Sequence, residues 1–372
     1  MNKIQSALGW IIGHSLPIKQ NKIVVSSYYG RGYSDSPKAI VQELLKQGTS
    51  YDIVWLTDDK NSLPDGVRAV PYNSIRRMLE LSTAKIWIDN CRKGAKFKKA
   101  GQYYMQLWHG FALKQIEKDV IDKLPDANYE NYAKRDSSQI DIIISNSDHM
   151  TRVYSDSFWY DGPVKQFGSP RNDMFFHDNS SVRKKVRRTL QIDDNTNIVL
   201  YAPTFRVTHS LEPYNMDSAA ICNALESRFG GKWVFVTRLH PNIAKLSSEL
   251  HYTDSVDATD YNDIQELLVA SDVLISDYSS VVFDFMLSKR PCFMYATDIE
   301  EYRNDRNFYI PLDEMPFPIS VDNRSFCESI EKFNKDDYND AVSKFMNNYG
   351  IKEDGQASKR CVDWIIKQME AK

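Results

Sequence analysis

Two successive series of alternating strand-like and helix-like segments constrain the fold of this chain more than any other feature of its sequence. In each series, short apolar runs rich in Val, Ile and aromatic residues are separated by longer segments with helical periodicity. This alternation is typical of βαβ units, whose strands form a parallel sheet and whose helices cover its faces. We therefore predict an α/β protein with two doubly wound parallel sheets.

The first series occupies the N-terminal half of the chain. Its predicted strands are residues 23–27, 52–57, 85–89, 103–108, 141–146 and 164–168. A helix is expected from Pro37 to Gln47, because proline suits the first turn of a helix and Gly48 suits its end. The preceding loop, at residues 30–32, lacks the third glycine of a dinucleotide-binding fingerprint, so it predicts only a loop beside a cleft.

A turn-forming sequence at residues 168–173 separates the two series. The second series has predicted strands at residues 197–202, 232–237, 272–276 and 291–295, followed by helices expected at 324–347 and 357–369. The predicted parts are an N-terminal Rossmann-like domain at 1–170, a C-terminal Rossmann-like domain at 171–350, and a C-terminal helix at 351–372 that packs back across the domains. Two Rossmann-like domains that face a central cleft form the architecture known as GT-B.

The composition excludes several classes of protein. At 372 residues, the chain is longer than a usual single core, which agrees with two domains. Its net charge of −3 gives no overall basic field for binding nucleic acid. The five cysteines are scattered and form no CxxC pair, which favours reduced thiols in a cytosolic protein over a disulfide framework or a zinc site.

No apolar run is long enough to cross a bilayer, but several segments have the composition of membrane-surface or cleft elements. Residues 4–18 suit either an amphipathic helix on a membrane or a helix packed on the first domain. The basic runs at 92–99 and 183–188 are either solvated surfaces or sites that attract an anion. The polar stretch 115–139 is long for a connection, and we expect it to form a helical insertion or a lid.

His109 lies directly after the predicted strand 103–108, in the sequence Trp108-His109-Gly110. Ligands of open α/β sheets bind at the carboxyl ends of the strands, and imidazole is suited to proton transfer near neutral pH. The alternative is a core histidine beside a tryptophan. A second histidine in a similar position, His240, follows the predicted strand 232–237 and favours the functional interpretation.

Polar groups follow three successive predicted strands of the second domain. They are Thr204 with Arg206, Arg238 with His240, and Ser279 with Ser280. Arginine offers a planar fork of donors that matches phosphate, and the two serines precede a helix whose free N–H groups and dipole favour an anion. Taken singly, these residues also fit a salt bridge, a turn and a helix cap. Taken together, they predict a site for a diphosphate.

No metal-binding motif, Walker loop or nucleophile elbow occurs in the sequence. A DxD arrangement on a turn is also missing, and the Asp pairs at 58–59 and 193–194 are typical of surface loops. We therefore expect neither a metal nor another cofactor. Cationic side chains are expected to stabilise the leaving phosphate by prearranged charge.

Five sequence motifs lie between residues 100 and 310. They are Trp108-His109-Gly110 with Leu113-Lys114, Gly168-Ser169-Pro170-Arg171-Asn172-Asp173, Ala202-Pro203-Thr204-Phe205-Arg206, Arg238-Leu239-His240-Pro241, and Ser276-Asp277-Tyr278-Ser279-Ser280-Val281-Val282-Phe283-Asp284-Phe285. In type and order they resemble the motifs of the CDP-glycerol glycerophosphotransferases, which build teichoic acids and related polyol-phosphate polymers. The first hundred residues match that family only in their secondary-structure pattern.

The resemblance implies a GT-B enzyme with a CDP-polyol donor, attached peripherally to an anionic membrane surface at the cytoplasmic face of the cell membrane. It implies that His109 is the general base for the acceptor hydroxyl, and that Arg238 and His240 hold the diphosphate and favour the departure of CMP. The other positions expected to bind substrate are Trp108, Gly110, Phe111, Ala112, Arg171, Pro203, Thr204, Arg206, Leu239, Ser279, Ser280 and Asp284.

The expected reaction transfers glycerol-phosphate or ribitol-phosphate from the CDP-polyol to a hydroxyl of a lipid-linked glycan or teichoic-acid-type polymer. The family often has Thr-Pro after Trp-His-Gly, whereas this chain has Phe111-Ala112, which removes a hydroxyl and adds an aromatic ring. This difference bears on the choice of polyol or acceptor. Two alternatives stay open: a GT-B glycosyltransferase or epimerase that uses a nucleotide sugar, and a non-catalytic membrane-associated subunit that binds a nucleotide.

Overall fold

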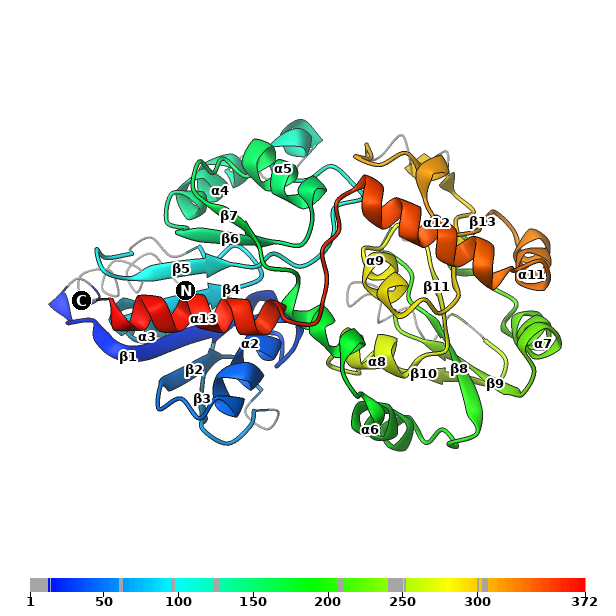
Figure 1. Ribbon diagram of the computed structural model, residues 1–372, viewed down its shortest axis with the longest axis horizontal. Helices are drawn as coiled ribbons and strands as arrows, with labels where there is room; N and C mark the ends of the chain where they lie inside the picture. The colour runs from blue at the N-terminus through cyan, green and yellow to red at the C-terminus, as the bar shows by residue number, and fades with distance from the viewer. Residues whose placement is uncertain are drawn as a thin grey trace. The chain divides into compact units, whose positions relative to one another are not determined.

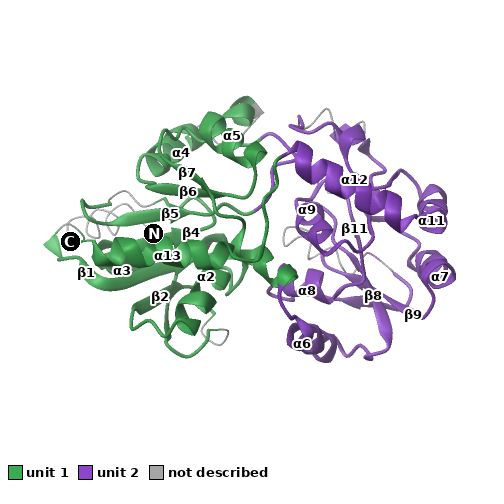
Figure 2. Cartoon of the chain, viewed as in Figure 1, with its two compact units in different colours: residues 1–109, 116–176, 350–372 green, residues 110–115, 177–349 purple. Residues whose placement is uncertain are grey.

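The chain forms two compact units, each built around its own parallel sheet (Figure 2). Unit 1 comprises residues 1–109, 116–176 and 350–372, and unit 2 comprises residues 110–115 and 177–349. The computed structural model describes residues 13, 15–59, 63–94, 98–123, 128–206, 211–239, 250, 252–299, 301–302 and 307–371. The prediction of an α/β fold with two parallel sheets is confirmed.

The sheet of unit 1 has the strand order β3-β2-β1-β4-β5-β6-β7, and all its neighbouring strands are parallel (Figure 1). The strands are β1 (Lys19–Ser26), β2 (Asp52–Leu56), β3 (Val67–Val70), β4 (Ala84–Asp89), β5 (Tyr103–Gln106), β6 (Ile142–Ser145) and β7 (Val164–Gln166). The α-helices are α2 (Asp35–Lys46), α3 (Ile75–Thr83), α4 (Tyr129–Ser137), α5 (Asp148–Ser157) and α13 (Ala357–Glu370). Short 3-10 helices span Tyr28–Gly30, Glu117–Lys123 and Pro170–Phe176.

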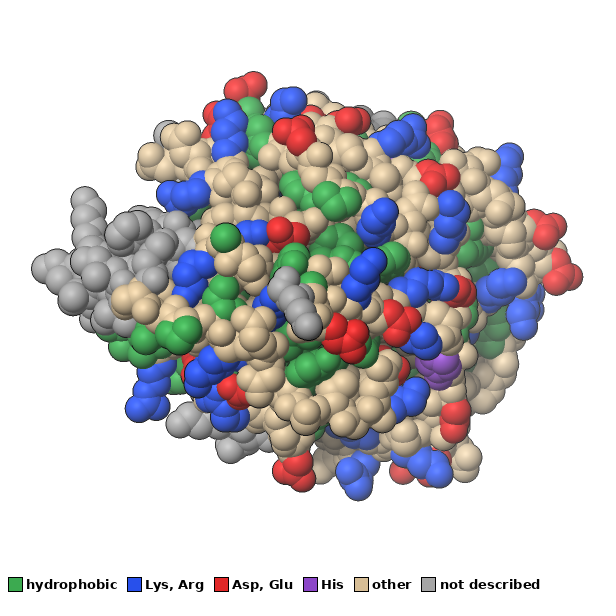
Figure 3. All heavy atoms as spheres, turned by 60° about the vertical axis from the view of Figure 1, so that its left-hand side comes forward, with side chains coloured by type: hydrophobic (Ala, Val, Ile, Leu, Met, Phe, Trp, Pro, Cys, Tyr) green, Lys and Arg blue, Asp and Glu red, His purple; other side chains and the backbone are tan. Residues whose placement is uncertain are grey.

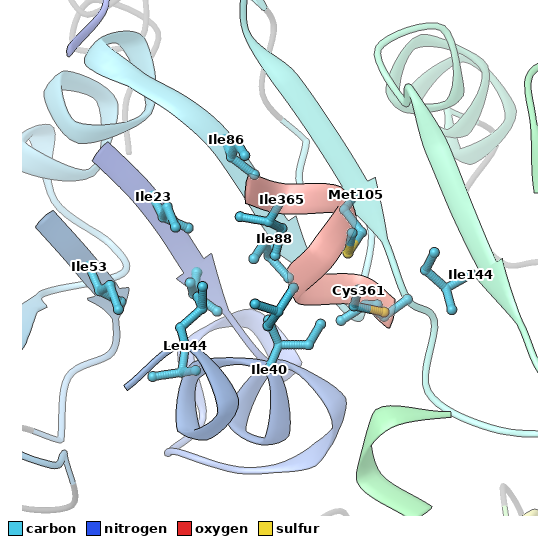
Figure 4. Close-up of a cluster of buried hydrophobic side chains, with 14 of the residues drawn as sticks. Ile23, Ile40, Leu44, Ile53, Ile86, Ile88, Met105, Ile144, Cys361 and Ile365 are labelled. Atoms are coloured by element: carbon cyan, nitrogen blue, oxygen red, sulfur yellow. The ribbon is translucent and has the colours of Figure 1, made fainter. Parts of the chain in front are cut away.

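Alternate residues of the strands form the main core of unit 1 (Figure 4). Ile23 of β1 and Ile86 of β4 belong to this core, and their side chains share a face because successive strand residues alternate in direction. Helices α2 and α13 cover that face with buried side chains such as Leu44 and Ile365. The core therefore joins the first β-strands of the chain to its last helix.

The sheet of unit 2 has the order β10-β9-β8-β11-β12-β13, which is the Rossmann order 3-2-1-4-5-6 when counted from β8. The strands are β8 (Thr196–Tyr201), β9 (Lys232–Thr237), β10 (Ser255–Asp257), β11 (Val273–Ser276), β12 (Cys292–Tyr295) and β13 (Ile319–Ser320). The helices are α6 (Ser180–Leu190), α7 (Ser218–Phe229), α8 (Ile264–Ala270), α9 (Val281–Phe285), α11 (Asn323–Glu331) and α12 (Lys335–Asn348), with 3-10 turns at Glu212–Tyr214, Met286–Ser288 and Leu312–Glu314.

The carboxylate of Asp173 caps helix α13. Its two oxygens accept hydrogen bonds from the backbone N–H groups of Ala357 (2.9 Å) and Ser358 (2.7 Å), at the start of the helix. These are N–H groups without a partner inside the helix, and the negative charge also suits the positive end of the helix dipole. The residue before the helix, Gln356, makes no side-chain cap of its own. Asp173 therefore supplies the cap from a distant part of unit 1.

Glu353 ties the segment before α13 to the same region. Its carboxylate accepts hydrogen bonds from the side chains of Asn146 (3.0 Å) and Asn172 (3.1 Å) and from the backbone of Ser169 (3.0 Å). Gly168 has φ = +90°, and a Cβ there would lie 2.9 Å from a Glu353 oxygen, so only glycine suits this position. The sequence predicted that this C-terminal helix packs across the domains, and the structure packs it on α2 and β4 of unit 1.

Two predicted segments differ from the structure in detail. The helix expected at 324–347 is two helices, because the Asn334 side chain accepts hydrogen bonds from the N–H groups of Asp336 and Asp337 and so starts α12. The stretch 115–139 contains the 3-10 helix at 117–123 and α4, as expected of a helical insertion. The short strands β3, β10 and β13 were not predicted, because runs of two to four residues carry little periodicity.

None of the described helices is both long enough and apolar enough to cross a membrane. The segment predicted to be amphipathic, residues 4–18, lies mostly outside the described residues. All five cysteines are free thiols.

Replacing Asp173 by Ala should destabilise unit 1. The two N–H groups that open α13 lose their acceptor, and losing a helix cap of this kind costs about 1–2 kcal/mol. Chemical denaturation followed by circular dichroism measures the change. Asp363→Ala is the matched control, because Asp363 is an exposed residue of the same helix and its carboxylate pairs with the exposed Lys359. Equal stabilities for the two variants would contradict the capping role.

Candidate active site

His109 lies in a tight turn that continues β5. The N–H of Leu107 still donates to the carbonyl of Asp89, the last residue of β4, at 2.9 Å. The N–H of Trp108 then donates to the side chain of Gln106, at 2.9 Å, and Trp108 has φ = +51°. A bulky residue with positive φ is rare and costs free energy, and such residues concentrate at functional sites. The turn directs the chain away from the sheet immediately before His109.

A backbone carbonyl fixes the tautomer of His109. The Nδ1 atom lies 2.7 Å from the carbonyl oxygen of Asn90. A carbonyl oxygen accepts but never donates, so Nδ1 must carry a proton. In the neutral ring the lone pair is then on Nε2. This is the arrangement that a general base needs, with one nitrogen held by the protein and the other able to accept a proton.

The surroundings of His109 favour its neutral form. Burial lowers the pKa of His109 below its usual value of 6.5, while the hydrogen bond to Asn90 acts in the opposite direction. The ring lies 4.4 Å from the ring of Trp108 and 5.7 Å from that of Tyr28, measured between centroids. The imidazole is therefore neutral at physiological pH and has two aromatic neighbours, one adjacent in the sequence and one from the loop after β1.

Arg171 is connected to this region through Asp35 and Tyr28. The Tyr28 hydroxyl donates to Asp35 at 2.6 Å, and the other Asp35 oxygen lies 3.8 Å from the guanidinium of Arg171. Arg171 is buried. The structure thus brings His109, Trp108 and Arg171, which the sequence had singled out, into one region of unit 1, and it adds Tyr28 and Asp35.

Most of the described basic side chains in the run 92–99 form ion pairs or hydrogen bonds within unit 1. Arg92 and Lys93 are buried, and they pair with Glu117 (2.7 Å) and Asp89 (2.8 Å) respectively. Lys98 pairs with Asp141 at 2.5 Å. Part of the run, residues 95–97, lies outside the described residues. In the described part, these contacts favour a structural role over an anion-binding surface.

The residues that directly follow His109 belong to unit 2. A Cβ on Gly110 would lie 2.5 Å from the hydroxyl oxygen of Ser280, so the backbone approaches this serine more closely than any other residue type allows. The ring of Phe111 packs on Phe283, with centroids 4.5 Å apart, and Ala112 is buried. The ring of Phe111 is therefore part of a packed aromatic cluster.

Asp277 organises the polar residues at the carboxyl ends of β8 and β11. This buried carboxylate accepts hydrogen bonds from the backbone N–H of Thr204 (2.9 Å), from the Thr204 hydroxyl and from the guanidinium of Arg206 (2.8 Å). The sequence placed Thr204 and Arg206 together after one strand, as part of a predicted diphosphate site, and in the structure both bind this carboxylate. Pro203 is buried beside them.

The guanidinium of Arg206 is shared between two carboxylates. Besides Asp277 it binds both oxygens of Asp298, at 2.5 and 3.0 Å, and its carbon lies about 5 Å from the rings of Tyr278 and Tyr302. Arg206 is 5% exposed. The sequence predicted a direct phosphate contact. The geometry instead favours Arg206 as the residue that holds the loop after β8 in place.

Arg238 continues β9, and its N–H donates to the carbonyl of Tyr201 on β8 at 2.9 Å. Its guanidinium donates to the carbonyl of Tyr261, at 3.2 and 3.4 Å, and is partly exposed. Leu239 is buried in a small cluster with Tyr214. His240 lies outside the described residues, so the structure describes only the first half of this motif.

Ser279 and Ser280 lie at the start of α9 and are partly exposed. The Ser279 hydroxyl accepts a hydrogen bond from the N–H of Val281 at 3.5 Å, as in an ordinary helix cap, whereas Ser280 makes no side-chain cap. Asp284 is buried one turn later and accepts a hydrogen bond from the side-chain amide of Gln265 at 2.8 Å. Of these three, the serines are the residues with exposed surface for a ligand.

Sequence reasoning missed four residues that shape these regions: Tyr28, Asn90, Asp277 and Asp298. Asn90 acts through its backbone carbonyl, which has no sequence signature. Asp277 lies inside a recognised motif, but the motif gave no role to it. Among the described residues, no group of three His, Cys, Asp or Glu side chains is placed to hold a metal ion.

Comparisons with known proteins agree on one family. The family model for CDP-Glycerol:Poly(glycerophosphate) glycerophosphotransferase matches residues 10–367. A teichoic acid poly(glycerol phosphate) polymerase of Bacillus spizizenii is 30% identical over 98% of this chain and 96% of its own length. A teichoic acid glycerol-phosphate transferase of Staphylococcus aureus is 30% identical over 95% of this chain and 94% of its own length.

Other relatives are longer. The chain spans about half the length of two of the curated relatives it matches, the teichoic acid poly(glycerol phosphate) polymerases of Staphylococcus epidermidis (51%) and Bacillus subtilis (50%). A solved structure of the wall teichoic acid polymerase TagF superimposes with a TM-score of 0.85 and 28% identity, over 98% of this chain and 93% of that one. The prediction of a GT-B fold is confirmed. A UDP-GlcNAc 2-epimerase from Neisseria meningitidis, with a TM-score of 0.55 and 15% identity, shares the fold alone.

Replacing Arg206 by Met should destabilise unit 2 strongly. The substitution leaves two carboxylates, Asp277 and Asp298, without their cation in a largely buried site, and breaking such a pair costs about 3–5 kcal/mol. Denaturant unfolding monitored by fluorescence measures the loss. Arg324→Met is the control, since its pair with Glu328 is exposed and should change the stability by less than about 0.5 kcal/mol. A stable Arg206→Met protein that had lost only donor affinity would instead support direct phosphate binding.

Proposed function

Because this chain belongs to the CDP-glycerol:poly(glycerophosphate) glycerophosphotransferase family, we propose that it is a polyol-phosphate transferase. Its donor is a CDP-polyol, either CDP-glycerol or CDP-ribitol. Its acceptor is a hydroxyl of a membrane-linked glycan or teichoic-acid-type polymer, and CMP is released. The names of relatives that match over nearly their full length, a glycerol-phosphate polymerase and a glycerol-phosphate transferase, support this assignment.

The geometry of His109 is the observation on which the mechanism rests. Its Nδ1–H is committed to the Asn90 carbonyl, so Nε2 is the atom that takes the proton of the acceptor hydroxyl. The acceptor oxygen then attacks the phosphorus that bears the polyol. The new P–O bond forms as the bond to CMP breaks, and CMP leaves with the electron pair. The proton ends on His109.

Unit 2 supplies the donor-binding residues in this proposal. Arg238, with its partly exposed guanidinium, and His240 neutralise charge on the departing phosphate, and Ser279 and Ser280 offer hydroxyl groups to the diphosphate. Thr204, Arg206 and Asp284 support the loops that carry these residues, because their polar groups are hydrogen-bonded within the unit. Arg171 has the corresponding role in unit 1.

A lipid-linked acceptor places the reaction at a membrane surface, and we propose peripheral attachment at the cytoplasmic face. On the face drawn in Figure 3, Lys and Arg side chains lie among Asp and Glu side chains. Helix α6 carries basic residues, but Arg183 and Lys185 pair with Asp272 (2.8 Å) and Glu266 (2.7 Å) of unit 2. Attraction to anionic lipid would therefore come from other segments or from contacts to the acceptor itself.

The direct test is incubation of the full chain with CDP-glycerol or CDP-ribitol and a defined lipid-linked glycan, followed by mass spectrometry of the product. We expect one of the donors to add a polyol-phosphate with release of CMP. His109→Gln keeps a polar side chain but removes the base, and we expect it to lower the rate by about 100-fold or more. Release of UMP or UDP from a nucleotide sugar, without CMP release from either CDP-polyol, would contradict the proposal.

The pH dependence follows from the lowered pKa of His109. The neutral ring is the active form, and burial favours that form, so the rate should fall at acid pH, as the ring takes up a proton, with a midpoint below pH 6.5. The dependence of kcat/KM on pH, measured with saturating acceptor, checks this. A midpoint above pH 7 would mean that another group, with a higher pKa, is the base.

A further inference from the structure

The loop after β1 contacts His109 through Tyr28, a residue that takes no part in the proposed proton transfer. The rings of Tyr28 and His109 meet edge to face, with centroids 5.7 Å apart and planes at 64°. Asn90, whose carbonyl holds the histidine, also accepts a hydrogen bond from the backbone N–H of Tyr28, through its side-chain oxygen at 2.9 Å. The three residues Tyr28, Asn90 and His109 thus form a closed set of contacts, which we call the His109 triangle.

The sheet order explains why these residues meet. Strands β1, β4 and β5 are neighbours in the sheet of unit 1. Tyr28 lies two residues after β1, Asn90 directly follows β4, and His109 lies three residues after β5. Since parallel strands end at the same edge of a sheet, each strand contributes one corner of the triangle. The register of the strands therefore determines the position of the imidazole.

The loop that carries Tyr28 is strained and heavily stabilised. Tyr28, Tyr29 and Asp35, which is the first residue of α2, have φ values of +43°, +59° and +63°. Residues other than glycine rarely adopt such values. The Tyr28 hydroxyl donates to Asp35 at 2.6 Å, and the other oxygen of Asp35 accepts from the N–H of Ser36 at 2.6 Å. These bonds offset the strain. Strain that is maintained in this way is expected where an exact side-chain position matters for function.

Asn90 is fully buried, and its side-chain nitrogen has no hydrogen-bond partner among the described residues. A buried amide that uses only its oxygen costs free energy relative to an apolar side chain. The arrangement is therefore not optimised for stability alone. The side-chain oxygen of Asn90 accepts a hydrogen bond from Tyr28, and its backbone carbonyl accepts one from His109.

We propose that Tyr28 and Asn90 are positioning residues that hold the imidazole of His109 in one orientation and keep water from its Nδ1 side. Tyr28 limits the rotation of the ring, and Asn90 fixes both the tautomer and the loop that carries Tyr28. The proposal rests on the proposed role of His109 as general base. It assigns no contact with substrate to either residue.

Several charged and titratable groups act on His109 besides these two residues. Asp35 and Glu117 favour its protonated form, Arg171 favours its neutral form, and the sulfur of Cys91 lies 3.7 Å from Nδ1. Burial outweighs them and lowers the pKa of His109. Opening the triangle admits water to the ring, and the pKa of His109 should then return toward 6.5.

The test compares Tyr28→Leu, Tyr28→Phe and Asn90→Ala in the full chain. The pKa of His109 is measured by NMR titration of isotope-labelled histidine, with His109→Gln identifying its signal. We expect Tyr28→Leu and Asn90→Ala to raise this pKa toward 6.5, and Tyr28→Phe to keep it near the wild-type value because the ring remains. We expect kcat with CDP-glycerol and a lipid-linked acceptor to fall about 10- to 100-fold in the first two variants, with KM for CDP-glycerol changed less than about twofold.

Tyr160→Phe is the matched control, since it also removes a buried tyrosine hydroxyl of unit 1, one that donates to the carbonyl of Pro163. It should leave both the pKa of His109 and kcat unchanged. If Tyr28→Leu does not fold, Asn90→Ala carries the test of the loop position, because it removes the side-chain oxygen that binds Tyr28 and keeps the backbone carbonyl that binds His109. An unchanged pKa and kcat in Asn90→Ala and in any folded Tyr28→Leu would overturn the positioning proposal. Failure of the wild type to release CMP from a CDP-polyol would instead contradict the proposed function, and the NMR titration would still report on the triangle.

Discussion

One hydrogen bond, from the ring of His109 to the carbonyl of Asn90, fixes the tautomer and the orientation of this imidazole in unit 1. It requires the end of β5 to lie beside the end of β4, and so it depends on the parallel pairing of the whole sheet. A backbone carbonyl performs here the task that a carboxylate performs in a serine protease triad, which is to select the tautomer. Because a carbonyl is neutral, it orients the ring without raising the pKa as strongly as a carboxylate would.

Unit 2 uses a different principle, in which carboxylates hold the basic and hydroxyl groups. Asp277 accepts hydrogen bonds from Thr204 and Arg206, and Asp298 accepts from the other side of the same guanidinium. Arginine in such a motif often suggests a phosphate ligand. Arg206 instead binds two carboxylates, and these bonds hold the loop after β8 in place. Arg238 and the two serines at the start of α9 keep exposed surface, and the proposed function assigns the contact with the donor to them.

The sequence predicted the two sheets and most of their strands, because strands buried on both faces are continuous apolar runs that alternate with helical segments. It also placed His109, Thr204 and Ser279 at strand ends, since motif position follows from strand position. It missed Asn90, which acts through its backbone carbonyl, and Tyr28, which has a positive φ. Neither feature can be read from the residue type. The sequence did not predict the ion pair between Arg206 and Asp298, because the two residues lie 92 positions apart in the chain.

The return of helix α13 to unit 1 has a consequence for biosynthesis. The ribosome completes the seven strands of the first sheet long before it makes the helix that covers one of their faces, and residues 177–349 of unit 2 are made in between. Until α13 docks onto Asp173, apolar residues such as Ile23 and Ile86 lack part of their cover. One apolar face of this sheet therefore lacks the cover of α13 until the end of the chain has been made, and such an exposed face is prone to aggregation.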